Sequence, residues 1–338
     1  MTPDSVLLEV DDLRIEFDTP EGKAWAVNGV SFHIREGETL GLVGESGCGK
    51  SLTALSILRL ITPPGRIASG RVLFRGRDLL TVSEPEIRKV RGKEIALIFQ
   101  EPVAALNPVF TVGDQIAEAI RVHNRVSKKD AMAEAVRLLK LVQIPDAERR
   151  VREYPHQMSG GMCQRIMIAM ALSCKPSIIM ADEPTTALDV TIQAEILDLL
   201  KRLKDDFRLS VLLISHNLGV IAGSADRVAV MYAGRIVEEA PVRELFASPK
   251  HPYTIGLLRS VPRLGATGHA QRRRLAAIPG TVPDPYAPEP GCPFAPRCGD
   301  VMPVCRREDP ALLPLDGGRK VACFLHHPTE GERKVAAP

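Results

Sequence analysis

The sequence is poor in aromatic residues and has no long hydrophobic run. Aromatic side chains make up 4% of its 338 residues, and 44 Lys plus Arg against 41 Asp plus Glu leave a net charge of only +3. No apolar segment approaches the roughly 20 residues of a membrane-spanning helix, and so small a charge excess argues against a dedicated nucleic-acid-binding protein. The first four residues lack the basic and apolar blocks of a secretory signal. We therefore expect a protein that is neither secreted nor integral to a membrane.

Short β-branched runs alternate with helical patterns over the first 235 residues, which is typical of an α/β fold. The apolar runs are continuous, as in strands that are covered on both faces. They predict strands at residues 39–43, 95–99, 178–181, 211–214 and 228–232. Apolar residues at helical spacing predict helices at residues 113–123, 131–141 and 191–203.

Residues 44–51 form the pattern G-x-x-x-x-G-K-S between the strand predicted at 39–43 and a helix-compatible run at 52–60. The glycines let backbone N–H groups converge on phosphate oxygens, and the helix N-terminus adds the positive end of its dipole. Lys50 supplies a charge for the β and γ phosphates, while the Ser51 hydroxyl can ligate Mg²⁺. The pattern predicts a nucleotide-phosphate site made of Gly44, Glu45, Ser46, Gly47, Cys48, Gly49, Lys50 and Ser51, with Cys48 as a small filler.

Polar side chains follow three further predicted strands. Asp182, after the strand at 178–181, is placed to hold Mg²⁺, and Glu183 beside it can act as the general base that polarises water. His216, after the next strand, can donate to the γ phosphate or hold the attacking water. Gln100 follows the strand at 95–99 and can contact both metal and water. Because ligands of open α/β sheets bind at the carboxyl ends of the strands, we expect these side chains to meet Lys50 and Ser51 at one edge.

Ser159, Gly160 and Gly161 precede an apolar helical run at residues 162–172. A helix N-terminus with a hydroxyl and exposed amides is a second candidate anion site. The chain has one phosphate loop and two such sites. Two chains that face each other head to tail would satisfy both.

These motifs, in this order and spacing, resemble those of the ATP-binding cassette (ABC) family, the ATPase subunits of ABC transporters. The resemblance identifies residues 44–51 as a Walker A motif, Gln100 as the Q-loop, residues 159–162 as the signature motif and residues 178–183 as a Walker B motif. His216 corresponds to the switch histidine of the family. Several ordered motifs are more specific than any one alone.

The resemblance implies an α/β core of the P-loop (RecA-like) type with an inserted helical subdomain. It places the nucleotide-binding domain at residues 6–240 and the helical subdomain at about 101–172. Residues 241–338 would form an irregular extension rich in cysteine and proline, with a four-cysteine region at 285–326. It also implies that Asp189, in the D-loop, belongs to the nucleotide site.

The stretches 99–108, 154–157, 181–191 and 251–258 resemble the dipeptide/oligopeptide importer branch of the family. This implies an ATPase that powers peptide uptake from the cytoplasmic face of a bacterial inner membrane. Its partners would be a second ATPase in a heterodimer, two membrane permease subunits and an extracytoplasmic peptide-binding protein, with no nucleic acid. Two alternatives stay open. The cargo could be nickel, glutathione or another small solute, or the chain could be a soluble ABC ATPase that acts on nucleic acid or ribosomes.

Two aromatic residues compete for the adenine ring of ATP. Phe17 fits the position that the family uses for stacking, and Trp25 is the alternative. Either ring could equally serve packing.

The C-terminal tail holds ten prolines between residues 279 and 314 and four of the seven cysteines. Proline at this density forbids long helices and central strands, so we expect mostly loops that fold apart from the nucleotide-binding core. The gaps between Cys292, Cys298, Cys305 and Cys323 are longer than those of a simple zinc ribbon. Four thiolates suit a [4Fe–4S] cluster, which the resemblance to the ATPase subunit of a dipeptide permease with four C-terminal cysteines supports. Zinc, with His326 or His327 as a substitute ligand, and unliganded thiols stay as alternatives.

Overall fold

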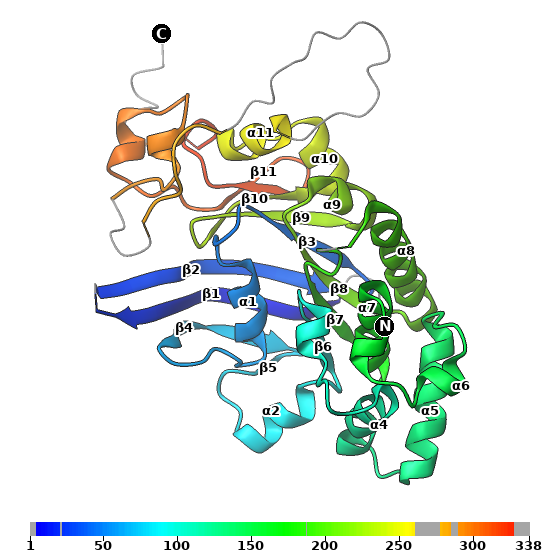
Figure 1. Cartoon of the computed structure of the whole chain (residues 1–338). Helices are drawn as coiled ribbons and strands as arrows, with labels where there is room; N and C mark the ends of the chain where they lie inside the picture. The colour runs from blue at the N-terminus through cyan, green and yellow to red at the C-terminus, as the bar shows by residue number, and fades with distance from the viewer. Residues whose placement is uncertain (1–4, 21, 187, 261–277, 285–289, 328–338) are drawn as a thin grey trace, which may run out of the picture.

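The computed structural model describes residues 5–20, 22–186, 188–260, 278–284 and 290–327 (Figure 1). Its centre is an eight-stranded sheet in the order β11-β12-β10-β9-β3-β8-β7-β6. Five of these strands are mutually parallel. They are β3 (Thr39–Val43), β6 (Ile95–Ile98), β7 (Ile178–Asp182), β8 (Ser210–Ser215) and β9 (Arg227–Tyr232). All five were predicted from continuous apolar runs, and the α/β class is confirmed.

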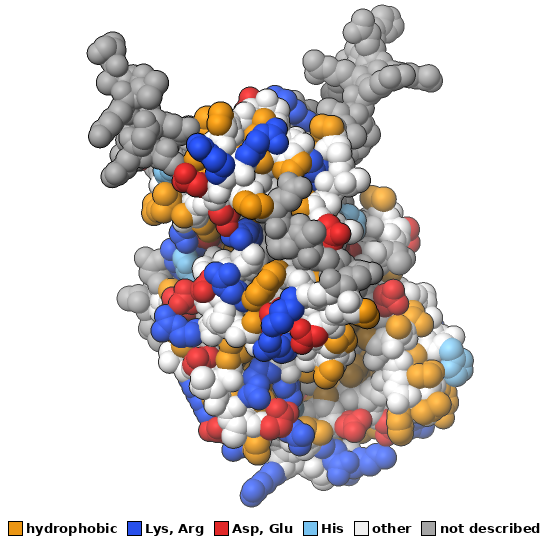
Figure 2. All heavy atoms as spheres, turned by 90° about the vertical axis from the view of Figure 1, so that its left-hand side faces the viewer, with side chains coloured by type: hydrophobic (Ala, Val, Ile, Leu, Met, Phe, Trp, Pro, Cys, Tyr) orange, Lys and Arg blue, Asp and Glu red, His pale blue; other side chains and the backbone are white. Residues whose placement is uncertain are grey.

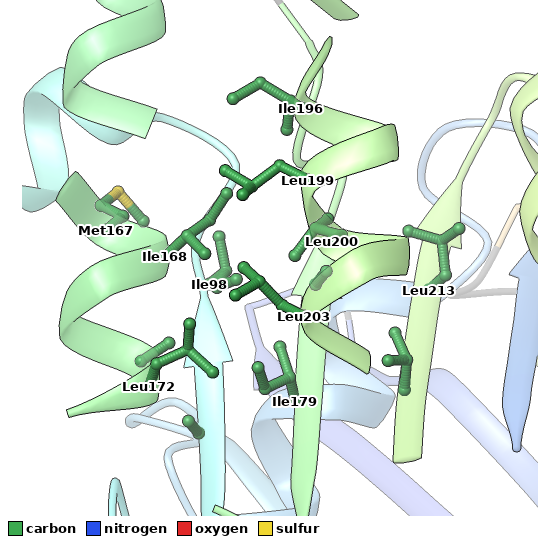
Figure 3. Packing of buried hydrophobic residues seen from close by; sticks show 14 of the residues in the cluster. Ile98, Met167, Ile168, Leu172, Ile179, Ile196, Leu199, Leu200, Leu203 and Leu213 are labelled. Carbon is green, nitrogen blue, oxygen red and sulfur yellow. The ribbon is translucent and has the colours of Figure 1, made fainter. Parts of the chain in front are cut away.

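The parallel strands are covered on both faces, as their sequences indicated. In β7, Ile178 and Met180 pack into one hydrophobic core, while Ile179 and Ala181 pack into the other. Side chains alternate between the faces of a strand, so successive residues enter opposite cores. Figure 3 shows Ile179 opposite Leu203 of α8 (Val190–Phe207) in the core that the helices cover.

The other face is covered by a four-stranded antiparallel sheet and by helix α1 (Lys50–Ile57). The sheet has the order β2-β1-β4-β5, and β1 pairs along most of its length with both β2 and β4. Its strands are β1 (Val6–Thr19), β2 (Gly22–Arg35), β4 (Gly65–Phe74) and β5 (Arg77–Asp78). None of these strands was predicted from the sequence.

Helices fill the segment between β6 and β7 and form the lower right part of Figure 1. Thr111, Ser127 and Ser159 cap three of them, each side chain accepting a hydrogen bond from a backbone N–H of the first turn. The helices are α3 (Pro102–Ala105), α4 (Val112–His123), α5 (Lys128–Leu141), α6 (Ala147–Arg150) and α7 (Gly160–Leu172).

After β9 the chain turns at residues 233 and 234, as predicted, and returns as β10 (Arg235–Pro241). Helix α9 (Leu218–Ser224) precedes β9, and α10 (Val242–Ala247) and α11 (Pro252–Arg259) follow β10. Helix α2 (Glu84–Val90), between β5 and β6, begins at a capping box formed by Ser83 and Glu86.

The C-terminal extension is mostly loops, but it does not fold apart from the core. Strand β12 (Arg319–Val321) pairs with β10 and continues the central sheet, and β11 (Leu313–Leu315) pairs with β12. Phe294 belongs to the main hydrophobic core. The expectation of a separately folded tail is therefore wrong, because short edge strands and one aromatic anchor join it to the nucleotide-binding core.

Among the described residues, no helix is both long and apolar enough to cross a membrane. The face in Figure 2 mixes Lys and Arg with Asp and Glu, and its hydrophobic side chains form small separate patches. This mixture agrees with the small net charge of the sequence.

Candidate functional site

The phosphate loop connects β3 to α1, and two of its glycines, Gly44 and Gly49, lie where the backbone of neighbouring strands comes close. A Cβ on Gly44 would lie 2.1 Å from the carbonyl oxygen of Met231, and one on Gly49 would lie 2.5 Å from that of Ala26. Gly49 also has a φ of +103°, which other residues rarely adopt. At the tip of the loop, Ser46 and Gly47 are exposed. The loop is therefore packed at its base and open at its tip.

Lys50 lies inside the curve of the loop and is only 5% exposed. Its Nζ donates to the carbonyl oxygens of Gly44 (2.9 Å) and Glu45 (3.0 Å). Cys48 packs behind the loop, with its Sγ 3.7 Å from the Lys50 ammonium, and burial raises the pKa of its thiol. An ammonium at this position in the loop suits the β and γ phosphates of a nucleotide.

Asp182 ends β7 beside the start of α1. Its Oδ1 is buried without a hydrogen-bond partner among the described residues. Burial raises the pKa of Asp182, and a hydrogen bond with Ser51 acts in the opposite direction. A buried carboxylate oxygen without a partner is costly unless a cation binds it. Carboxylate and hydroxyl oxygens are ligands that Mg²⁺ prefers, so these two residues fit that ion.

Glu183 is the centre of a hydrogen-bonded group. Its Oε2 accepts from Gln100 Nε2 at 2.9 Å and from Thr186 Oγ1 at 2.8 Å, and its Oε1 lies 3.0 Å from His216 Nδ1. Burial acts to raise the pKa of Glu183, but the hydrogen bonds from His216 and Thr186 outweigh it and the pKa is lowered. The carboxylate is thus ionised and held at both oxygens.

The site residues come from neighbouring strand ends, as the sequence analysis expected. The sheet order is β8-β7-β6, so His216, Glu183 and Gln100 follow three adjacent parallel strands. Thr186 was not predicted. Its spacing could have indicated it, because a hydroxyl residue three positions after a carboxylate can donate to it within a turn.

Ser159, Gly160 and Gly161 lie at the start of α7. Among the described residues, no hydrogen bond joins them to the phosphate loop. Ser159 and Gly160 are exposed. Beside them, Asp189 caps α8 by accepting from the backbone N–H of Ile192 at 3.0 Å.

The two adenine candidates differ in their surroundings. Phe17 is half-buried and packs against the hydrophobic core between the parallel strands and the antiparallel sheet. Its ring occupies the space beside Gly65. Trp25 is also half-buried and lies opposite Glu16 on the neighbouring strand.

The four C-terminal cysteines line one small cavity together with His251 and Asp300. All four cysteines are free thiols. Burial raises the pKa of Cys292 to about 12 and that of Cys323 to about 11. Within the described ranges, however, no three His, Cys, Asp or Glu side chains are arranged to hold a metal ion. The expected metal centre is therefore not preformed in the described residues, either as a cluster site or as a zinc site. The Nε2 of His326 instead lies 3.1 Å from the Lys250 carbonyl oxygen.

Comparison with known proteins agrees with this geometry. Residues 27–186 match the family model described as ABC transporter, and residues 237–305 match that of the oligopeptide/dipeptide transporter C-terminal region. The chain is 53% identical to a probable peptide ABC transporter ATP-binding protein, y4tR, of Sinorhizobium fredii, over 94% of this chain and 95% of that protein. It is 51% identical to the dipeptide transport ATP-binding protein DppD of Bacillus subtilis, over 94% of each chain.

Solved structures share the fold of the core. The dimeric ATP-binding cassette MJ0796, in a post-hydrolysis state bound to ADP and Pi, aligns with a TM-score of 0.63 at 27% identity, over 70% of this chain and 99% of that one. The cbiO1 protein of Clostridium perfringens, part of the ABC transporter complex cbiONQ, aligns with a TM-score of 0.62 at 25% identity, over 72% and 92%. The chain therefore belongs to the ABC transporter family, as an ATPase whose sequence also carries the oligopeptide/dipeptide transporter C-terminal region.

Proposed function

We propose that this chain hydrolyses ATP to power a bacterial importer of dipeptides or oligopeptides. The observation that carries the proposal is the carboxylate of Glu183, held by Gln100, Thr186 and His216 beside the phosphate loop. The peptide cargo rests on relatives about half identical to this chain, whose names state peptide or dipeptide transport. The match of residues 237–305 to the oligopeptide/dipeptide transporter C-terminal region points the same way.

In this proposal, each residue of the site has a defined role. Lys50 and the amides of the loop bind the phosphates, and Ser51, Asp182 and Gln100 hold Mg²⁺, which neutralises charge on the phosphates. Glu183 accepts a proton from the attacking water, and its lowered pKa keeps it ionised for that task. His216 keeps the carboxylate in place and faces the γ phosphate. Phe17 stacks on the adenine ring.

The chain works as one half of a heterodimer of ATPases. Ser159 and Gly160 are exposed and not bonded to the phosphate loop of their own chain, so they are free to cap the ATP of a partner. Asp189 contributes to the same shared site. The related MJ0796 cassette was solved as a dimer. The nucleotide-binding domain spans residues 6–240, with its helical subdomain at about 101–172, and residues 241–338 form the extension.

Two membrane permease subunits bind the helical subdomain at the cytoplasmic face of the inner membrane, and a peptide-binding protein delivers cargo from outside. Several large hydrophobic side chains between β6 and α4 are exposed, which supports a protein partner on this surface. They are Phe99, Val103, Val109 and Phe110.

We also propose that the four-cysteine region, residues 285–326, binds a [4Fe–4S] cluster. Four free thiols around one cavity are the ligand set that such a cluster uses. The cavity measures about 20 Å³, so the side chains of Cys292, Cys298, Cys305 and Cys323 would have to move apart on binding. Iron analysis of anaerobically purified protein tests this: about four irons per chain are expected. One zinc would indicate a different metal site, and no metal in oxygen-free protein would refute the cluster.

The cargo is tested with the assembled importer in liposomes, supplied with its binding protein. We expect ATP turnover to rise when the binding protein carries a dipeptide or oligopeptide, and to stay basal with nickel or glutathione. Because a complete site needs the signature residues of a partner, we expect little turnover from this chain alone when light scattering shows a monomer. Stimulation by nucleic acid or ribosomes, without any effect of peptide, would contradict the proposal.

A further inference from the structure

The C-terminal extension contacts the phosphate loop directly. Arg297, in the single-turn 3-10 helix Ala295–Arg297, donates from Nη1 to Glu45 Oε2 at 2.8 Å and from Nη2 to Glu45 Oε1 at 3.1 Å. Tyr253 of α11 accepts a hydrogen bond from the backbone N–H of the same Glu45 at 2.9 Å. One residue of the loop is therefore held at its side chain and at its backbone by two residues that follow the cassette core.

The guanidinium of Arg297 has few alternative positions. Its Nε donates to the Pro279 carbonyl oxygen at 2.9 Å, and its Nη1 lies 3.3 Å from the Tyr232 hydroxyl. Arg297 is 9% exposed, and the bond to Glu45 raises its pKa further, so it is always charged. A bidentate arginine–carboxylate pair with its other donors satisfied is among the more directional contacts of proteins.

Aromatic packing holds both contacts in place. The ring of Phe294, three residues before Arg297, lies 5.3 Å edge-on from that of Tyr232 and 5.5 Å from that of Tyr253. The Tyr232 and Tyr253 rings are 4.6 Å apart. Tyr232 ends β9, and the residue before it, Met231, packs against Gly44. The extension, α11 and the strand beside the loop thus form one packed unit.

We propose that Arg297 and Tyr253 are positioning residues for the phosphate loop, so that the C-terminal extension forms part of the ATP-binding apparatus. The tip of the loop, Ser46 and Gly47, is exposed and lies between Gly44 and Gly49 in the sequence. A loop of this kind loses backbone entropy when it orders around phosphates. Fixing Glu45 beforehand lowers that cost and strengthens binding without any contact between the extension and the nucleotide.

The test compares Arg297→Gln with Arg319→Gln in the full-length chain. Arg319 is a matched control because it also belongs to the extension, is also 9% exposed, and also binds a carboxylate, that of Glu244 in α10. The Nη1 of Arg319 donates to the Ser248 carbonyl oxygen at 2.7 Å. Neither this bond nor the one to Glu244 involves the phosphate loop. We expect Arg297→Gln to weaken ATP binding about 10- to 100-fold, within the range for losing hydrogen bonds to a charged group, and Arg319→Gln to leave it within about twofold.

Two further variants separate positioning from general loosening. Tyr253→Phe removes one oxygen, keeps the ring in the core and leaves the Glu45 N–H without its partner. We expect weaker ATP binding than in Arg319→Gln, with thermal unfolding lowered no more than in that control. Glu45→Gln combined with Arg297→Gln should be no worse than Arg297→Gln alone, because both act through one contact. In the assembled importer, the KM for ATP should rise while kcat changes little. Equal effects of Arg297→Gln and Arg319→Gln, additive losses in the double variant, or unchanged ATP affinity in Tyr253→Phe would each overturn the proposal.

Discussion

The Nδ1 of His216 lies 3.0 Å from Oε1 of Glu183, although the two residues are 33 positions apart in the sequence. They follow the adjacent parallel strands β8 and β7, and the backbone N–H of Glu183 continues the pairing by donating to the Ile214 carbonyl oxygen at 3.0 Å. Because an ionised carboxylate can only accept, the histidine must carry its proton on Nδ1. The Nε2 of His216 is then the atom that is free to face the nucleotide.

Thr186→Val should shift the pH dependence of hydrolysis. The Thr186 hydroxyl donates to Glu183 at 2.8 Å and helps to lower the pKa of that carboxyl. Without it the pKa of Glu183 rises, so the acid limb of the kcat profile should move to higher pH by about one unit. Thr186→Ser keeps the hydroxyl and should restore the wild-type profile. Identical profiles for Thr186→Val and wild type would show that this bond does not tune the base.

His216→Ala should lower kcat by about 100-fold or more, the range for a group that assists proton transfer, while ATP affinity changes little. The reason is that the carboxylate of Glu183 loses its partner on Oε1, whereas Lys50 and the loop amides are untouched. His123→Ala, at the end of α4 and outside the site, is the control and should keep wild-type turnover. A variant of His216 with full turnover would remove the histidine from the mechanism.

Gly49→Ala should abolish ATP binding. The added Cβ would lie 2.5 Å from the Ala26 carbonyl oxygen, and the φ of +103° is strained for alanine. Gly223→Ala in α9 is the matched control, because a Cβ there meets nothing within 4 Å. That variant should bind ATP normally and should be as stable as wild type or slightly more stable. Equilibrium titration with ATP, together with circular dichroism to verify folding, distinguishes the two results.

The buried imidazole of His251 should make the protein less stable in mild acid. Burial lowers the pKa of its imidazole from 6.5 to about 3, so the unfolded chain binds one more proton than the folded chain between these values. Stability should therefore fall as the pH drops below 6.5, by up to about 1.4 kcal/mol per pH unit. His251→Asn keeps an acceptor for the Tyr253 N–H and does not titrate. Urea unfolding from about pH 7 to about pH 5 should give a shallower pH slope for this variant, and equal slopes would refute the assignment.

Much of the core and its site could be predicted because the signals are local. Continuous apolar runs mark strands buried on both faces, and a polar residue directly after such a strand must lie at the carboxyl edge of the sheet. Gln100, Glu183 and His216 each follow such a strand, so their meeting at one edge could be expected from the sequence. The signature residues at 159–161 were likewise identified as a helix N-terminus, which α7 confirms.

The parts that could not be predicted depend on contacts between distant residues. Strands β1 and β2 carry register shifts, so their alternation of apolar and polar residues is broken and no simple period marks them. The bond between Glu45 and Arg297 joins residues 252 positions apart. No local pattern indicates it, and for that reason the extension was wrongly expected to fold separately from the core.

The most direct test of the account is Glu183→Gln in the assembled importer. This change keeps the size of the side chain and leaves Lys50, Ser51 and Asp182 in place, but an amide cannot accept the proton of the attacking water. Glu195→Gln, an exposed position on α8, is the control and should turn over ATP normally. We predict that Glu183→Gln binds ATP within about threefold of wild type, while steady-state hydrolysis falls by about 1,000-fold or more. Near wild-type hydrolysis by Glu183→Gln would contradict the account, because Glu183 would then not be the base.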